Sequence, residues 1–210
     1  MIAAVILAAG RSTRMGRPKQ ILPIRGRPML QEVLGIFRRT RVGRVVVVLG
    51  ANARKVRHSV DFQQEVVVLN RRFAEGMGSS LRIGLASIGD DADAVIVALG
   101  DQPLLSPATV NRVIEAYLNS RARVVVPVFN GRRGHPDLFD KVLFPQIMNV
   151  QGDAGAREVV EKCRRGLLEV AVEDEGVLVD IDTPADYEDV ALQGRPSKRW
   201  KGVKEAISRP

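Results

Sequence analysis

The sequence predicts an α/β fold in which a mostly parallel sheet carries helices on both faces. Apolar runs rich in Val and Ile alternate along the chain with amphipathic stretches, the order of elements that is typical of doubly wound sheets. Most of these runs are continuous rather than alternating in polarity, as expected for strands that are buried on both sides. Together these observations predict a single Rossmann-like domain.

The strands and helices are predicted from the period of the apolar residues. The predicted strands are 3–7, 45–49, 65–69, 94–99, 124–127, 168–172 and 177–181. The predicted helices are 29–39, 54–62, 79–87, 107–119, 154–164 and 184–192. Ser106 and Thr183 each precede a proline that suits the first helical position, so both are predicted to be N-caps.

Length and composition limit the classes of protein that remain. With 210 residues, we expect one domain over residues 1–192, followed by an appended basic tail over residues 193–210. The single cysteine, Cys163, excludes an intramolecular disulfide, and two histidines are too few for an imidazole metal site, so any metal is expected to have oxygen ligands. No apolar run approaches the ~20 residues of a membrane span, so we expect a cytoplasmic protein without a membrane partner.

The net charge of +8 is unevenly distributed. Residues 1–44 contain ten Lys or Arg side chains against one acidic side chain, and residues 193–210 contain six against one. The remainder of the chain is acidic. A basic N-terminal loop on an acidic body suits a small anionic ligand, and aromatic residues at 4% offer few stacking platforms, so nucleic acid is not expected as a partner.

The strongest local motif is the loop that follows the first predicted strand. It reads Leu7-Ala8-Ala9-Gly10-Arg11-Ser12-Thr13-Arg14-Met15-Gly16-Arg17-Pro18-Lys19-Gln20. Its small residues let backbone N–H groups approach phosphate oxygens, while Arg14 and Lys19 supply positive charge. The spacing of Gly10 and Gly16 does not fit a Walker A loop. A solvated basic loop is the alternative interpretation.

Further motifs follow in a fixed order. They are Glu75-Gly76-Met77-Gly78-Ser79-Ser80-Leu81-Arg82, Gly100-Asp101-Gln102-Pro103, Gly134-His135-Pro136, Gly152-Asp153-Ala154-Gly155-Ala156-Arg157 and Asp180-Ile181-Asp182-Thr183-Pro184. With the first loop, they resemble the molybdenum cofactor cytidylyltransferase branch of the single-domain nucleotidyltransferases. The resemblance extends to about Leu192.

The resemblance implies a magnesium-dependent transfer of CMP from CTP to the terminal phosphate of molybdopterin, with release of pyrophosphate. It also implies a molybdoenzyme or its maturation chaperone as a partner. Three other functions stay open: guanylyl transfer to molybdopterin, nucleotidyl transfer to a sugar or methylerythritol phosphate, and nucleotide binding without catalysis. RNA binding through the tail is disfavoured by the acidic middle of the chain.

Arg14, Lys19 and Asp101 are the predicted catalytic residues. Asp101 ends a predicted strand, where a carboxylate can hold Mg²⁺; its rival role is to form the turn before Pro103. Asp182 is the predicted second metal ligand and is preferred to Asp180. Capping of the helix at residue 184 is the rival role of Asp182, but Thr183 is better placed for it.

The remaining site residues are assigned to the two substrates. The predicted nucleotide-binding residues are Leu7, Ala8, Ala9, Gly10, Arg14, Lys19, Gly76, Ser79, Ser80 and Asp101. Gly76, Ser79 and Ser80 open a helix and offer N–H and hydroxyl groups, although a turn with an N-cap explains them equally well. His135, Asp153 and Arg157 are assigned to the second substrate; His135 and Asp153 also suit structural roles. The Ala9 methyl group is expected to narrow the base pocket and favour CTP over GTP.

Overall fold

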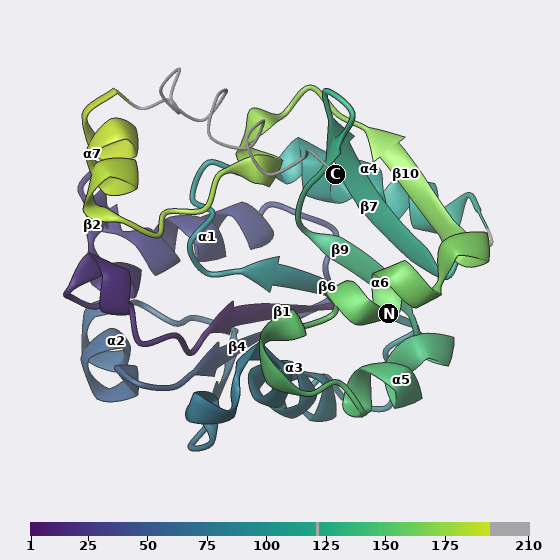
Figure 1. The fold of residues 1–210 in the computed structure, drawn as a ribbon, viewed down its shortest axis with the longest axis horizontal. Helices are drawn as coiled ribbons and strands as arrows, with labels where there is room; N and C mark the ends of the chain where they lie inside the picture. The colour runs from purple at the N-terminus through teal and green to yellow at the C-terminus, as the bar shows by residue number, and fades with distance from the viewer. Residues whose placement is uncertain (121, 194–210) are drawn as a thin grey trace, which may run out of the picture.

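The computed structural model describes residues 1–120 and 122–193 and contains one mixed sheet with helices packed on both of its faces (Figure 1). The strand order in the sheet is β10-β7-β9-β6-β1-β4-β5. The strands are β1 (Ile2–Ala8), β4 (Arg44–Leu49), β5 (Val66–Leu69), β6 (Ala94–Leu99), β7 (Val124–Phe129), β9 (Asp137–Asp140) and β10 (Leu167–Ala171). The short β8 (Arg132–Arg133) pairs with β7, and β2 (Pro23–Ile24) and β3 (Arg27–Pro28) form a separate hairpin.

The strands of the sheet are parallel to one another, except for β9 and the short β8, which is antiparallel to β7. β1 pairs in parallel with both β4 and β6, and β7 pairs in parallel with β10. β9 is antiparallel to β6 on one side and to β7 on the other, so β6 and β7 run in the same direction. The predicted Rossmann-like, mostly parallel α/β fold is therefore confirmed.

Alternate residues of the central strands feed two hydrophobic cores. Ala4 and Ile6 of β1 pack with α1 (Met29–Phe37), α2 (Ala53–Ser59) and α4 (Pro107–Leu118) on one face. Ala3 and Val5 pack with α3 (Met77–Ala86), α5 (Phe144–Met148) and α6 (Arg157–Lys162) on the other. Because side chains alternate across a strand, the continuous apolar run of β1 supplies both layers.

A third, smaller core lies beyond the ends of the strands. It is formed by Met15, Leu22, Ile24, Met29, Val179, Ile181 and Val190, the last of which belongs to α7 (Pro184–Gln193). This cluster packs the loop after β1 against the segment that leads into α7. The two segments are thereby held together at the same end of the molecule, on the left of Figure 1.

One predicted strand is wrong. Residues 177–181 form no strand: the 3₁₀ helix Glu175–Leu178 is followed by extended chain, and Ile181 donates its N–H to the carbonyl of Asp101. The stretch is apolar because Val177, Val179 and Ile181 are buried against other segments. Conversely, β9 and α5 were not predicted, and the helix predicted at 154–164 is confined to Arg157–Lys162, preceded by the 3₁₀ helix Gly152–Ala154.

Both predicted N-caps are confirmed. The Ser106 hydroxyl accepts a hydrogen bond from the N–H of Ala108, and that of Thr183 accepts one from the N–H of Asp186. The Asp186 carboxylate in turn accepts from the N–H groups of Asp182 and Thr183, which completes a reciprocal capping box.

Two other expectations concern the domain boundary at residue 192 and membrane-spanning helices. Residues 194–210, nearly all of the predicted tail, lie outside the described residues, so the domain boundary at residue 192 stays a prediction. None of the helices in the described ranges has the length and apolarity needed to span a bilayer.

Two helical glycines that look alike in the sequence should respond oppositely to alanine. A Cβ at Gly84 would lie 2.4 Å from Cγ1 of Val5, whereas a Cβ at Gly35 would meet no atom within 4 Å. Gly35→Ala should raise the free energy of unfolding by about 0.5–1 kcal/mol through helix propensity. Gly84→Ala should lower it by about 1–3 kcal/mol through overpacking. Urea denaturation of both variants checks this, and a stabilised Gly84→Ala protein would contradict the packing of α3 on β1.

Candidate active site

The candidate site lies where β1, β4 and β6 end. In parallel sheets, ligands bind outside the carboxyl ends of strands. Figure 1 shows these ends facing α7 and β2, where the third hydrophobic core joins the loop after β1 to the chain before α7. The predicted catalytic and metal-binding residues are all brought to this edge.

Four charged side chains from three segments form one connected cluster. Lys19 Nζ donates a hydrogen bond to Oδ1 of Asp182 at 2.7 Å and another to Oδ2 of Asp101. Arg14 Nη2 donates to Oδ2 of Asp182 at 2.9 Å. The sequence assigned these residues separately, and the structure places them in direct contact. We call this group the charge cluster.

Exposure differs within the charge cluster. The side chains of Lys19 and Asp101 are 14% and 16% exposed, whereas that of Arg14 is 68% exposed. Lys19 and Asp101 therefore form the floor of the site. Arg14 stands at its rim, where it can also reach a ligand.

The charge cluster perturbs its own ionisation. Burial alone would lower the pKa of the Lys19 amine, but Asp101 and Asp182 raise it above its ordinary value. Burial alone would raise the pKa of the Asp182 carboxyl, but Lys19 and Arg14 hold it below its usual range. Lys19 and Asp182 are therefore both charged at neutral pH. The site then presents fixed charges of both signs.

The residues present fit a hard divalent cation. Asp101 Oδ1 is buried and has no hydrogen-bond partner among the described residues. Its other oxygen and Oδ1 of Asp182 share the Lys19 ammonium group, so the two carboxylates lie side by side. Mg²⁺ is commonly held by one or two carboxylates together with substrate phosphates. No group of three or more His, Cys, Asp or Glu side chains suited to a metal occurs in the described ranges, so the protein would supply only this carboxylate pair.

Gln20 and Ser12 shape the loop after β1, although the sequence gave them no role. The buried Gln20 side chain donates to the carbonyls of Ala8 at 3.1 Å and Gly10 at 3.2 Å. The Ser12 hydroxyl accepts from the N–H of Lys19 at 3.1 Å. In the described part of the chain, the N–H groups of Gly10, Arg11 and Ser12 make no hydrogen bond. They are thus available to an anion, as the predicted phosphate loop requires.

The Ala9 methyl group does not face the space above this loop. Ala9 is 6% exposed and belongs to the core between the sheet and α3. A Cβ at Gly50 would lie 2.8 Å from the Ala9 Cβ, so the methyl group points at the chain after β4. This direction weighs against the expectation that the Ala9 methyl group narrows the base pocket, which stays a prediction.

The segment around Gly76 lies next to the loop after β1. The Arg11 guanidinium group stacks over the Phe73 ring at 5.4 Å from its centroid, which links the loop after β1 to the chain just before Gly76. Ser79 and Ser80 are buried, however, and both hydroxyls accept hydrogen bonds from the Asn70 side chain, at 2.8 and 2.9 Å. Their hydroxyls are thus engaged inside the protein, and a nucleotide contact by Gly76, Ser79 or Ser80 stays a prediction.

Asp153 caps a helix, but not the one expected. Its Oδ1 accepts a hydrogen bond at 3.2 Å from the N–H of Met77, at the start of α3. A carboxylate at this position also favours the positive end of the helix dipole. Gly76 makes the approach possible, since a Cβ there would lie 2.5 Å from the backbone carbon of Gly152. Asp153 is thus engaged at the start of α3, and its contact with the second substrate stays a prediction.

His135 and Arg157 line a separate cavity of about 400 Å³, which we call the side cavity. Gln102 and Asp180, next to the charge cluster in sequence, form its border with that cluster. Asp137, which the sequence did not single out, lies in its wall and is 6% exposed. Burial raises the pKa of the Asp137 carboxyl, while His135 and Arg133 act against this shift.

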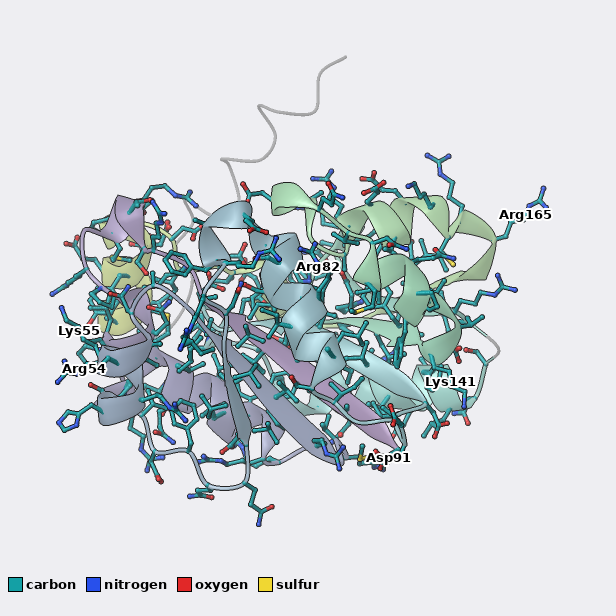
Figure 2. All side chains as sticks on the ribbon, turned by 90° about the horizontal axis from the view of Figure 1, so that it is seen from below. Arg54, Lys55, Arg82, Asp91, Lys141 and Arg165 are labelled. Carbon is teal, nitrogen blue, oxygen red and sulfur yellow. The ribbon has the colours of Figure 1, made fainter. Side chains whose placement is uncertain are left out.

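Charge is distributed differently at the two ends of the molecule. Figure 2 shows the exposed Arg54 and Lys55 of α2 at the end that carries α7 and the candidate site. Asp91 and Lys141 lie toward the opposite end, where Asp93 pairs with the N-terminal amine at 2.6 Å and with Lys141 at 3.1 Å.

Comparison with known proteins gives consistent matches. Residues 4–167 match a family model described as the MobA-like NTP transferase domain. Nicotine blue oxidoreductase of Paenarthrobacter nicotinovorans is 34% identical over 191 residues, which cover 87% of this chain and 92% of that protein. Purine catabolism protein PucB of Bacillus subtilis (strain 168) is 32% identical over 198 residues, with 89% and 94% covered.

A solved structure agrees with the fold. Rv0371c from Mycobacterium tuberculosis H37Rv superposes with a TM-score of 0.84 and 34% identity, covering 91% of this chain and 97% of that chain. A structure of Rv0371c in complex with manganese has a TM-score of 0.80 and 32% identity, and the match covers 91% of this chain and 98% of that chain.

Asp153 should matter for stability rather than for catalysis. Asp153→Ala removes the cap of α3 and should lower the free energy of unfolding by about 1 kcal/mol, whereas Asp153→Asn keeps an acceptor oxygen and should lose less. Arg157→Ala is the control: its side chain is exposed and, among the described residues, pairs only with Glu161, so its effect should stay within about 0.5 kcal/mol. Thermal and urea denaturation measure these effects. Unchanged stability with weakened substrate affinity in Asp153→Ala would instead support its predicted contact with the second substrate.

Ala9→Gly tests the direction of the methyl group. The variant should lose about 1 kcal/mol of stability, because it empties a packed position and adds backbone freedom. The ratio of the specificity constants for CTP and GTP should stay unchanged. A shift of that ratio toward GTP would show that the methyl group borders the base after all.

Proposed function

Because the chain belongs to the MobA-like NTP transferase family, we propose that it transfers CMP from CTP to the terminal phosphate of molybdopterin and releases pyrophosphate. The family match and its relatives confirm the nucleotidyltransferase that the motifs indicated. The chain is thus an enzyme that binds a nucleoside triphosphate. CTP as donor and molybdopterin as acceptor are the proposed part.

The charge cluster is the observation that carries the proposal. Nucleotidyl transfer brings together two anions and moves negative charge onto the leaving pyrophosphate. Lys19 donates hydrogen bonds to both Asp101 and Asp182. Arg14 donates one to Asp182, while its side chain is largely exposed. These two cations stand beside the loop whose N–H groups are available to a triphosphate.

The attacking group needs no general base. The second pKa of a phosphate monoester is about 6, so the acceptor phosphate is already largely ionised at neutral pH. The task of the protein is then to align two mutually repelling anions and to neutralise the developing charge. Arg14 and Lys19 suit this task, since both are cations at the edge where the two substrates would meet.

Asp101 and Asp182 are the proposed ligands of Mg²⁺. When bound, the ion would neutralise triphosphate oxygens and polarise the reacting phosphoryl group. The buried, unpartnered Oδ1 of Asp101 supports this assignment. Thr183 rather than Asp182 caps α7, which leaves the Asp182 carboxylate to the site. A similar structure, Rv0371c, was solved as a complex with manganese, which supports the binding of a divalent ion in this fold.

The choice of CTP and molybdopterin is supported by the order and spacing of the motifs. The Gly152–Arg157 motif favours the molybdopterin branch over transfer to a sugar or methylerythritol phosphate. A cytoplasmic location and a molybdoenzyme or maturation chaperone as partner are proposed on the same basis.

Product analysis tests the proposal directly. The protein is incubated with Mg²⁺, molybdopterin and each of CTP, GTP, ATP and UTP, and the products are identified by mass. We expect the cytidylylated pterin and pyrophosphate from CTP. A guanylylated product would move the chain to the guanylyl branch, and a product formed only with another phosphorylated acceptor would overturn the choice of molybdopterin.

Variants of the charge cluster should lose turnover without losing the fold. Asp101→Ala should abolish activity, and Lys19→Ala should lower kcat by at least ~100-fold, the scale of losing one preorganised charge partner of a developing anion. Lys55→Ala is the matched control, since it removes an exposed cation at the same end of the molecule outside the cluster (Figure 2). Steady-state kinetics with circular dichroism checks this. Near wild-type activity of Asp101→Ala in Mg²⁺, or an effect of Lys19→Ala confined to KM, would contradict these roles.

A further inference from the structure

The side cavity borders the charge cluster on the half of the sheet edge that the phosphate loop does not occupy. The phosphate loop and Gly76 belong to the half built from β1, β4 and β5, whereas the side cavity is reached from β6, β9 and β7. Gln102 directly follows Asp101, and Asp180 precedes Asp182 by two residues. A ligand in the side cavity would therefore lie next to the cluster, opposite the nucleotide.

The walls of the side cavity combine apolar faces with unpaired acceptors. Val126, Val160 and Val177 provide the apolar surface. Gln102 donates its Nε2 to Oδ1 of Asp180 at 2.6 Å, which leaves its buried Oε1 without a partner. No group in the described part of the chain donates a hydrogen bond to the Asp137 carboxyl, although this residue is 6% exposed.

His135 does not satisfy Asp137. Its Nδ1 lies 3.5 Å from Oδ2 of Asp137, outside hydrogen-bond geometry, and is itself buried without a partner. The Asp137 carboxylate thus has acceptor capacity that no hydrogen bond from the described residues uses, and it stands in the wall of a cavity that a ligand could enter. A ligand that matches Asp137 would therefore bring N–H groups to this carboxylate.

The shape and chemistry together favour a flat heterocycle with adjacent N–H groups. The valine surface suits the faces of a ring, and a cavity of about 400 Å³ is within the range of small-molecule sites. A carboxylate has two oxygens in one plane and accepts two parallel hydrogen bonds from neighbouring N–H groups. Arg133 and Arg157 at the cavity border suit the anionic substituents of such a ligand.

We propose that the side cavity holds the pterin ring of the acceptor and that Asp137 determines specificity by accepting hydrogen bonds from its ring N–H and 2-amino groups. This assignment rests on the proposed function for the identity of the acceptor. Gln102 Oε1 supplies a further acceptor, and the ring places the phosphate side of the ligand toward the charge cluster.

Equilibrium binding of two simple rings tests this without CTP or catalysis. Pterin carries the amino group beside the ring N–H, whereas lumazine has an oxygen in that position. Fluorescence titration of the full chain should show pterin bound at least about tenfold more tightly than lumazine, in line with one bidentate pair. Asp137→Asn, which offers one acceptor and one donor, should lose this preference while still binding lumazine, and the retained lumazine binding shows that the variant is folded.

The outcomes separate this inference from the proposed function. Equal affinity of the wild-type protein for both rings, or an unchanged preference in Asp137→Asn, would overturn the ring assignment even if CMP transfer to molybdopterin is observed. A preference for pterin that Asp137→Asn abolishes would support it even if no nucleotide is transferred, and the failure would then lie with the proposed reaction.

Discussion

The Lys19 ammonium group is the constraint on which the site depends. It is 82 residues from Asp101 and 163 residues from Asp182, and it binds both. A largely buried ammonium group is costly unless it is paired, so the loop after β1 adopts its position only when the end of β6 and the chain before α7 are both in place. The third hydrophobic core lies beneath the same segments and holds them by packing. Charge pairing and apolar burial thus select one arrangement of three distant parts of the chain.

The reversed strand β9 gives the sheet edge two chemically different halves. A parallel strand delivers the residues that follow it to this edge, whereas an antiparallel strand delivers the residues that precede and begin it. His135 and Asp137 are therefore at the same edge as Asp101, although they stand before a strand instead of after one. One half presents a loop with available N–H groups, and the other presents the Asp137 carboxylate, to which no described group donates a hydrogen bond.

The fold class, six of the strands and the members of the charge cluster were accessible from the sequence, because long apolar runs and polar strand ends are local signals. β9 was not predictable from the sequence, because Asp137-Leu-Phe-Asp140 is short and has an acidic residue at each end. Its strand conformation depends on pairing with β6 and β7. The stretch 177–181 misled because burial in a loop gives the same composition as a strand. The directions of the Ala9 methyl and the Ser79 and Ser80 hydroxyls depend on Gly50 and Asn70, partners that no spacing rule identifies.

The Gly76 and Gly152 segments pack so closely that a Cβ at Gly76 would lie 2.5 Å from the backbone carbon of Gly152. Asp153 accepts a hydrogen bond across this contact from the N–H of Met77. A side chain at Gly76 would clash with the Gly152 backbone, so the spacing between the two segments has little room to change. A residue inserted on one side would have to be matched on the other, 76 positions away. The two segments are therefore expected to evolve as a single unit in length. Because the two segment lengths would change together, α3 and the chain before α6 would keep a fixed separation while the surfaces around them diverge.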